Sequence, residues 1–144
     1  MPRLLLLALL LSPAAHATEA HWCDLPQAHP VDAVFAAAIA RSGGVTADMR
    51  DAQGQAYEGW DAELNRLYRA VMRQLDGGPR ADALRQAQRA WLTWDDAEAT
   101  SDISMQEDSG SAGPLVIADQ AIARRRARAC TLYMLLDSPA SPSP

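Results

Sequence analysis

The chain has 144 residues, of which 49% are hydrophobic, and a formal net charge of −5 without a single lysine. Its length is suited to one domain with its own core. The acidic balance disfavours nucleic acid as a partner, because a phosphate backbone requires a net-positive face. It suits a basic protein partner instead.

Residues 1–17 have the features of a secretory signal peptide. Arg3 supplies a positive charge, and Leu4 to Leu11 form an apolar stretch too short to span a bilayer. The small-residue pattern Ala15-His16-Ala17 then predicts cleavage before Thr18. No second long apolar run follows. The sequence therefore predicts an exported protein, periplasmic or secreted, with no membrane span in the mature chain.

Cys23 and Cys130 are the only cysteines, and both lie beyond the predicted cleavage site. In an oxidising compartment, two such cysteines are expected to form one disulfide. It would join the segment after the leader to the last predicted helix. The chain has no CxxC motif or other metal-ligand set, so we expect no metal and no cofactor.

Residues 18–45 form an N-terminal arm with one short predicted helix. Pro26 and Pro30 oppose regular structure at first, and apolar residues then follow helical spacing up to Ile39. Gly43-Gly44 would end this helix, and Thr46 is a suitable N-cap for a long second one. The second helix should end at a turn of Asp, two Gly and Pro, and its apolar stripe contains Trp60, Leu64, Leu67, Tyr68, Val71, Met72 and Leu75.

The third helix is predicted to begin near Arg80 and to continue toward Ala99. A polar connection over residues 100–113 follows, and Pro114 suits the first turn of a last helix. Residues 138–144 alternate serine and proline and should be disordered. No alternating strand pattern occurs. We predict an all-α domain over residues 46–137, a small bundle of three main helices plus the short N-terminal helix and one disulfide.

Two polar-aromatic clusters stand on the long helices, Leu64-Asn65-Arg66-Leu67-Tyr68 and Gln88-Arg89-Ala90-Trp91. Each places an amide, Asn65 or Gln88, on or beside an apolar stripe. An unpaired amide in a core costs about 1–3 kcal/mol, so each amide needs a partner. We expect the amides to bond each other, Tyr68 or a nearby backbone group, and so to fix the register of the two helices.

These clusters, with a Gly-Ser-rich turn and an arginine-rich last helix, resemble the LprI-type (DUF1311) family. The family is named for the inhibition of lysozyme, and its members are secreted or envelope proteins. The resemblance runs from about Thr46 to about Leu136, and Gly110-Ser111 supports it more weakly. It implies a polar-aromatic core made by the anchors Leu64, Asn65, Tyr68, Gln88, Arg89 and Trp91.

Side chains that could perform catalysis are few. His21 and His29 lie in the proline-containing arm outside any catalytic motif, and we expect both to be exposed. Asp95, Asp96 and Glu98 offer carboxylates of the kind that glycosidases use, but neighbouring helical positions point to different faces. The sequence therefore predicts no catalytic residue.

Tryptophan and arginine positions leave two further questions open. Trp60 and Trp91 fall on apolar stripes and should be core residues, whereas Trp94 lies at the edge of such a face. The basic run of the last helix should form a solvated face, with one arginine turned inward to bond Asp95, Asp96 or a helix end. The alternative is a patch for an anionic ligand or envelope polymer, and its members are Arg124, Arg125, Arg126 and Arg128.

The acidic connection is the predicted partner-binding element. Loops between rigid helices commonly carry recognition, and an acidic loop can enter a basic cleft. Its candidate residues are Asp102, Glu107, Asp108, Ser109 and Ser111. We expect a non-enzymatic binding protein that occludes the cleft of a lysozyme or binds another basic envelope protein. The alternative is a periplasmic structural or stress-related interaction module with an unknown envelope partner.

Overall fold

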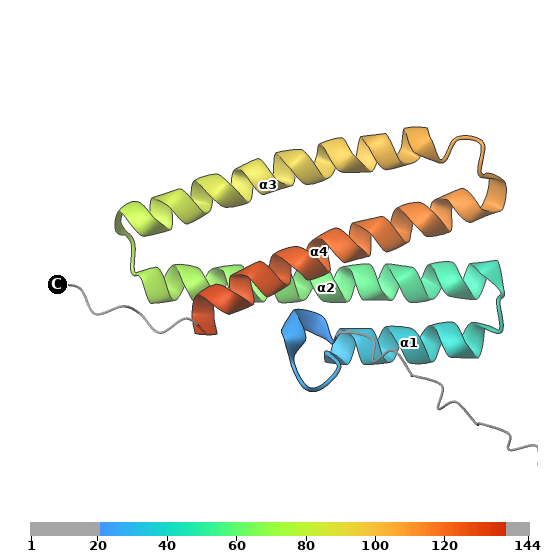
Figure 1. Ribbon diagram of the computed structural model, residues 1–144, viewed down its shortest axis with the longest axis horizontal. Helices are drawn as coiled ribbons and strands as arrows, with labels where there is room; N and C mark the ends of the chain where they lie inside the picture. Colours follow the sequence, from blue (N-terminus) through green and yellow to red (C-terminus); the bar gives the residue numbers. More distant parts are fainter. Residues whose placement is uncertain (1–20, 138–144) are drawn as a thin grey trace, which may run out of the picture.

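The computed structural model describes residues 21–137, and these residues form only helices and their connections (Figure 1). The helices α1 (Pro30–Ser42), α2 (Thr46–Leu75), α3 (Gly78–Met105) and α4 (Gly113–Asp137) alternate in direction along the chain. Single 3-10 turns, η1 (Trp22–Asp24) and η2 (Gly110–Ala112), precede α1 and α4. The all-α prediction is confirmed. The predicted signal peptide and the Ser/Pro tail lie outside the described residues.

The centre of the domain is the contact between α2 and α4, which run side by side in the same direction (Figure 1). α1 packs on α2, while α3 lies on the other side and contacts α4 and α2 less closely. None of the helices in the described region is both long and apolar enough to cross a membrane. The buried core cluster contains Trp22, Ala56, Trp60, Leu64, Leu67, Val71, Leu84, Ile122, Ala129 and Leu132.

Helices α1, α2 and α4 begin or end at the residues that the sequence indicates. Gly43 follows α1 in the left-handed region, with φ of 56°. Asp76 and Gly77 make the turn after α2 with positive φ values of 49° and 84°, which glycine and, less often, aspartate adopt at little cost. Pro114 lies in the first turn of α4. These turns fix the lengths of the packed helices.

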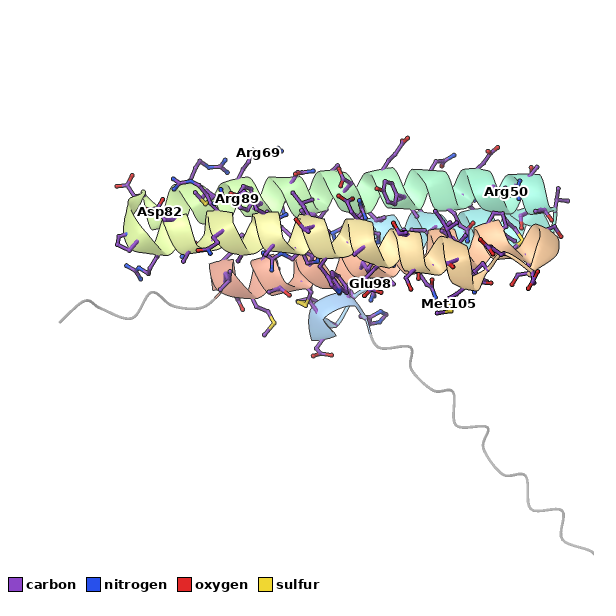
Figure 2. All side chains as sticks on the ribbon, turned by 90° about the horizontal axis from the view of Figure 1, so that it is seen from above. Arg50, Arg69, Asp82, Arg89, Glu98 and Met105 are labelled. Carbon is purple, nitrogen blue, oxygen red and sulfur yellow. A yellow bond between two sulfur atoms is a disulfide. The ribbon has the colours of Figure 1, made fainter. Side chains whose placement is uncertain are left out.

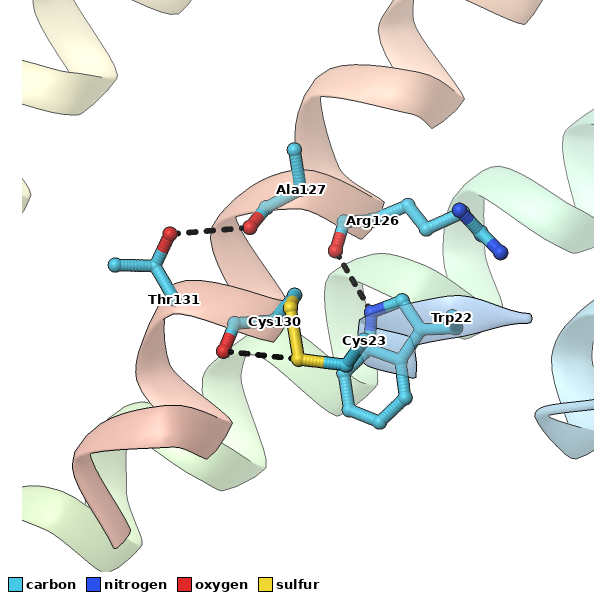
Figure 3. The surroundings of a disulfide bond; sticks show 6 residues. All are labelled: Trp22, Cys23, Arg126, Ala127, Cys130 and Thr131. Carbon is cyan, nitrogen blue, oxygen red and sulfur yellow. Dashed lines mark hydrogen bonds between the residues drawn. A yellow bond between two sulfur atoms is a disulfide. The ribbon is translucent and has the colours of Figure 1, made fainter. Parts of the chain in front are cut away.

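The predicted disulfide between Cys23 and Cys130 is confirmed, and the two Cα atoms are 5.3 Å apart (Figure 3). It ties η1 to α4. The neighbouring Trp22 is buried, and its Nε1 donates a hydrogen bond of 2.9 Å to the carbonyl of Arg126. The Trp22 ring also packs against Trp60, with 5.3 Å between ring centroids. The segment after the leader is therefore part of the core.

α3 is longer than predicted, because it ends at Met105 instead of near Ala99. The hydroxyl of Thr100 donates to the carbonyl of Asp96 at 3.0 Å, and Asp102 accepts a hydrogen bond of 2.5 Å from Arg124 of α4. The contact of Asp102 with α4 opposes the low helix propensity of Thr, Ser and Asp in this stretch. The connection between α3 and α4 is consequently only residues 106–112.

Replacing both cysteines, Cys23→Ser with Cys130→Ser, should lower the free energy of unfolding by about 2–4 kcal/mol. The disulfide closes a loop of 107 residues, and without it the unfolded chain is less restricted. Chemical denaturation followed by tryptophan fluorescence measures the change. A reductant should destabilise the wild type and leave the double variant unaffected. Equal stability of the two oxidised proteins would contradict this prediction.

Candidate functional site

The structure places a buried carboxylate, Asp95 of α3, between two arginines of α4. Asp95 has 5% of its surface exposed. Arg124 Nε donates to Oδ1 at 2.7 Å, and Arg125 Nη1 donates to Oδ2 at 2.9 Å. A charge removed from water needs compensation of this kind. The contact of α3 with α4 therefore contains a charged junction as well as apolar packing.

The two arginines extend this junction to other residues. Arg124 Nη1 donates to Asp102 at 2.5 Å, and Arg125 Nε lies 3.3 Å from an oxygen of Asp61. The Arg125 guanidinium also lies 4.1 Å from the centroid of the Tyr57 ring. Burial by itself lowers the pKa of Arg124, but the hydrogen bonds to its two carboxylate partners outweigh burial and raise that pKa. Helices α2, α3 and α4 are thus linked through adjacent residues of α4.

Arg126 links α4 to α1. Its Nε donates to Asp32 Oδ2 at 2.9 Å, and Asp32 Oδ1 accepts a hydrogen bond of 3.1 Å from Trp60 Nε1. A single carboxylate of α1 is therefore shared between α4 and α2. We call the side-chain contacts made by Arg124, Arg125 and Arg126 the arginine junction.

His29 belongs to the fold, contrary to the expectation that it is exposed. Its Nδ1 accepts the backbone N–H of Val31 at 3.3 Å and caps α1. Its ring stacks on Trp60 with 4.4 Å between centroids. A histidine side chain can act as a cap because its unprotonated ring nitrogen is an acceptor. His21 is exposed, as predicted.

The two amides of the polar-aromatic clusters do not bond to each other. Gln88 is buried and its Oε1 accepts from Arg128 Nε at 3.0 Å. Asn65 is exposed, and its Nδ2 donates to the carbonyl of Asp61, one turn earlier in the same helix, at 2.9 Å. Burial lowers the pKa of Arg128. Only Gln88 joins two helices in the expected manner, and its partner is an arginine.

The core predicted from the family anchors is confirmed only in part. Leu64 is buried, and Tyr68 and Trp91 pack half-buried against the core. Asn65 and Arg89 are exposed, so their assignment to the core is wrong. Each follows a core residue directly, and one residue turns the side chain by about 100° toward solvent.

The expectation of a solvated arginine face on α4 is also wrong. All four arginines of the run bond side chains of other helices, where one inward arginine was expected. Successive positions differ by about 100° around the helix axis, so three adjacent arginines can reach three directions. One feature of the sequence indicated which face of α3 the arginines of α4 contact. A single buried face of this helix is marked by the helical spacing of Leu84, Gln88, Trp91 and Asp95.

The predicted partner-binding residues are separated by the structure. Glu107, Asp108, Ser109 and Ser111 are exposed in the connection between α3 and α4, at the same end of the bundle as the turn between α1 and α2 (Figure 1). Their side chains make no hydrogen bond within residues 21–137. Asp102 instead lies half-buried in α3 and bonds Arg124, so its assignment to the loop is wrong.

Acidic residues and exposed apolar side chains occur together at this end of the bundle. Every charged residue between Ala90 and Ala123 is acidic. Ile103 and Met105 are 58% and 78% exposed, and Val116 is 38% exposed (Figure 2 labels Met105). We call residues 103–116 the acidic tip. Exposed carboxylates beside exposed apolar side chains suit a basic protein partner that also offers apolar contacts.

Other candidate groups are occupied or scattered. Both oxygens of Asp95 are bonded to arginines, whereas Asp96 faces solvent, so the two do not share a site. Within residues 21–137, no group of three or more His, Cys, Asp or Glu is placed to hold a metal ion. Trp60 is fully buried, as predicted, and Trp94 is 47% exposed on α3.

Asp95→Asn should destabilise the fold by about 3–5 kcal/mol, because it leaves two half-buried guanidinium groups without their shared carboxylate. Thermal and chemical unfolding of the purified variant measure this loss. Asp96→Asn is the matched control, since Asp96 is exposed, and it should change stability by less than about 0.5 kcal/mol. Similar effects of the two variants would contradict the importance of the junction.

The ionisation of Glu63 should make the stability of the fold depend on pH. Hydrogen bonds from Arg66, at 2.7 Å and 2.6 Å, lower the pKa of Glu63. A carboxylate with a lower pKa in the folded state stabilises the fold above its unfolded pKa, and this contribution is lost as the pH falls through the folded pKa. Glu63→Gln should therefore lower the melting temperature at about pH 7 more than at about pH 2. An equal decrease at both pH values would contradict this assignment.

The model of the family described as lysozyme inhibitor LprI matches residues 37–132. This range contains α2, α3, the acidic tip and the arginines of α4. Neither the curated proteins nor the solved structures gave a match. Because the matched range covers most of the chain, the protein belongs to the lysozyme inhibitor LprI family.

Proposed function

We propose that the protein binds a lysozyme through the acidic tip and inhibits it by occluding its cleft. Membership of the LprI family supports lysozyme as the target. We choose the acidic tip as the binding surface because Glu107 and Asp108 are exposed there, on a short connection at the end of two long helices. A basic cleft would attract these carboxylates.

The arrangement around the tip favours binding without large rearrangement. Arg124 bonds both Asp95 and Asp102, and this second bond lies close to the end of α3. The two helices that hold the connection are therefore fixed to each other. A connection with fixed ends loses less conformational entropy on binding than a free segment.

The apolar side chains of the tip would add contact area to the electrostatic attraction. Met105 is the most exposed of the large hydrophobic residues among residues 21–137, and Ile103 lies two residues before it. Interfaces commonly combine a methionine or aromatic contact with a polar rim. Occlusion needs no chemical step, so the proposed role is non-enzymatic.

Export to the compartment of a lysozyme is part of the proposal. The predicted leader at residues 1–17 would direct it. The disulfide between Cys23 and Cys130 supports an oxidising compartment, because such bonds persist outside the reducing cytosol.

The test is inhibition and direct binding of the oxidised mature protein with c-type, g-type and i-type lysozymes. Glu107→Gln with Asp108→Asn should weaken inhibition of the sensitive lysozyme at least about tenfold, since two interface charges are lost. Asp76→Asn with Asp82→Asn removes the same charge at the opposite end of the bundle and should leave inhibition unchanged. Circular dichroism should show the wild-type fold for both variants.

Two outcomes would overturn the proposal. Absence of binding to all three lysozyme types would exclude lysozyme as the target and favour the alternative of an envelope interaction module. Equal losses in the tip variant and the control variant would exclude the acidic tip as the contact surface.

A further inference from the structure

The end of the bundle opposite the acidic tip carries a surplus of arginines. Figure 2 shows Arg69 and Arg89 toward this end, and Met105 toward the other. Arg66 and Arg85 are paired within their own helices with Glu63 and Asp82. Four further arginines are exposed, and their side chains form no hydrogen bond or ion pair within the described residues; we call Arg69, Arg73, Arg80 and Arg89 the basic end.

The fold itself does not account for these four side chains. Where α4 needs arginines for packing, each one is bonded to a side chain of another helix. Arg80 lies in the first turn of α3, which has no side-chain cap and no acidic residue. The C-terminus of α2 lies beside the N-terminus of α3, so the dipoles of the two helices offset each other there. The positive charge of this end therefore comes from its arginines.

We propose that the basic end docks on a bilayer surface that contains anionic phospholipids. Guanidinium groups bind phosphate through paired, charge-assisted hydrogen bonds. Arg73 lies in the last turn of α2 and Arg80 in the first turn of α3, so both can contact a surface that meets this end of the bundle. The turn between α2 and α3 extends beyond the end of α4 (Figure 1), so a flat surface can reach it.

The distribution of charge sets the orientation on such a surface. The chain has a net charge of −5, so an anionic surface repels the molecule except at the basic end. The 30 residues of α2 span about 45 Å, whereas surface potentials decay over about 8 Å at physiological ionic strength. The acidic tip is therefore held away from the surface and left accessible. This proposal does not depend on lysozyme being the target of the tip.

The test is co-sedimentation of the oxidised mature protein with vesicles of phosphatidylglycerol and phosphatidylcholine, and with vesicles of phosphatidylcholine alone. The protein should bind only the anionic vesicles, and binding should fall as salt is raised. Each arginine near such a surface contributes about a fivefold increase in partitioning, so Arg73→Gln with Arg80→Gln, the two that flank the turn, should weaken binding about 25-fold.

Arg41→Gln with Arg50→Gln is the matched control, because it removes two exposed and unbonded arginines from the other end of the bundle. It should change vesicle binding less than about twofold. Both variants should keep the wild-type melting temperature, and without vesicles the basic-end variant should keep the wild-type activity toward any lysozyme that the protein inhibits. A lost vesicle interaction can thereby be separated from a lost interaction of the acidic tip.

Three results would overturn the proposal. These are equal binding to neutral and anionic vesicles, equal losses in the two double variants, and no binding to anionic vesicles at low salt. Binding of soluble inorganic polyphosphate together with the third result would assign the basic end to a soluble polyanion instead of a membrane.

Discussion

A buried carboxylate that must be neutralised is the constraint on which the arrangement of α3 depends. α3 packs less closely on the other helices than α1 does on α2, and Asp95 at its centre holds Arg124 and Arg125 of α4. Breaking a buried ion pair on one side leaves an uncompensated charge, which is far more costly than losing a surface pair. A shift of one residue would turn Asp95 by about 100° away from α4, so the junction also favours one register of the two helices.

The same junction separates the charges of the molecule into two ends. The arginines of α4 are used inside the bundle, where they neutralise Asp95, Asp102 and Asp32. The exposed charges on the distal half of α3 and on the connection are acidic. Around the turn between α2 and α3, exposed arginines outnumber exposed carboxylates such as Asp76. A protein with a net charge of −5 therefore has exposed acidic residues at one end and an excess of arginines at the other.

Sequence patterns predicted the helices well and the charged contacts poorly. Periodic apolar residues and the turns at Gly43 and Asp76 indicated where α1 and α2 end, because these features are local. The length of α3 was underestimated because Asp102 is held by Arg124, a residue of another helix. The pairing of Gln88 with Arg128, in place of Asn65, also depends on the position of α4. An arginine has a long side chain, so helical spacing alone does not identify its partner.

The sequence by itself determined the all-α class, the disulfide, the family and the acidic character of the connection between the last two helices. Each of these follows from local spacing, from the presence of only two cysteines, or from a short motif. Only the tertiary structure decided which acidic residues are free. Asp95 and Asp102 are neutralised, whereas Glu107 and Asp108 remain exposed, because the direction and packing of α4 bring its arginines to the first pair and leave the second pair in solvent.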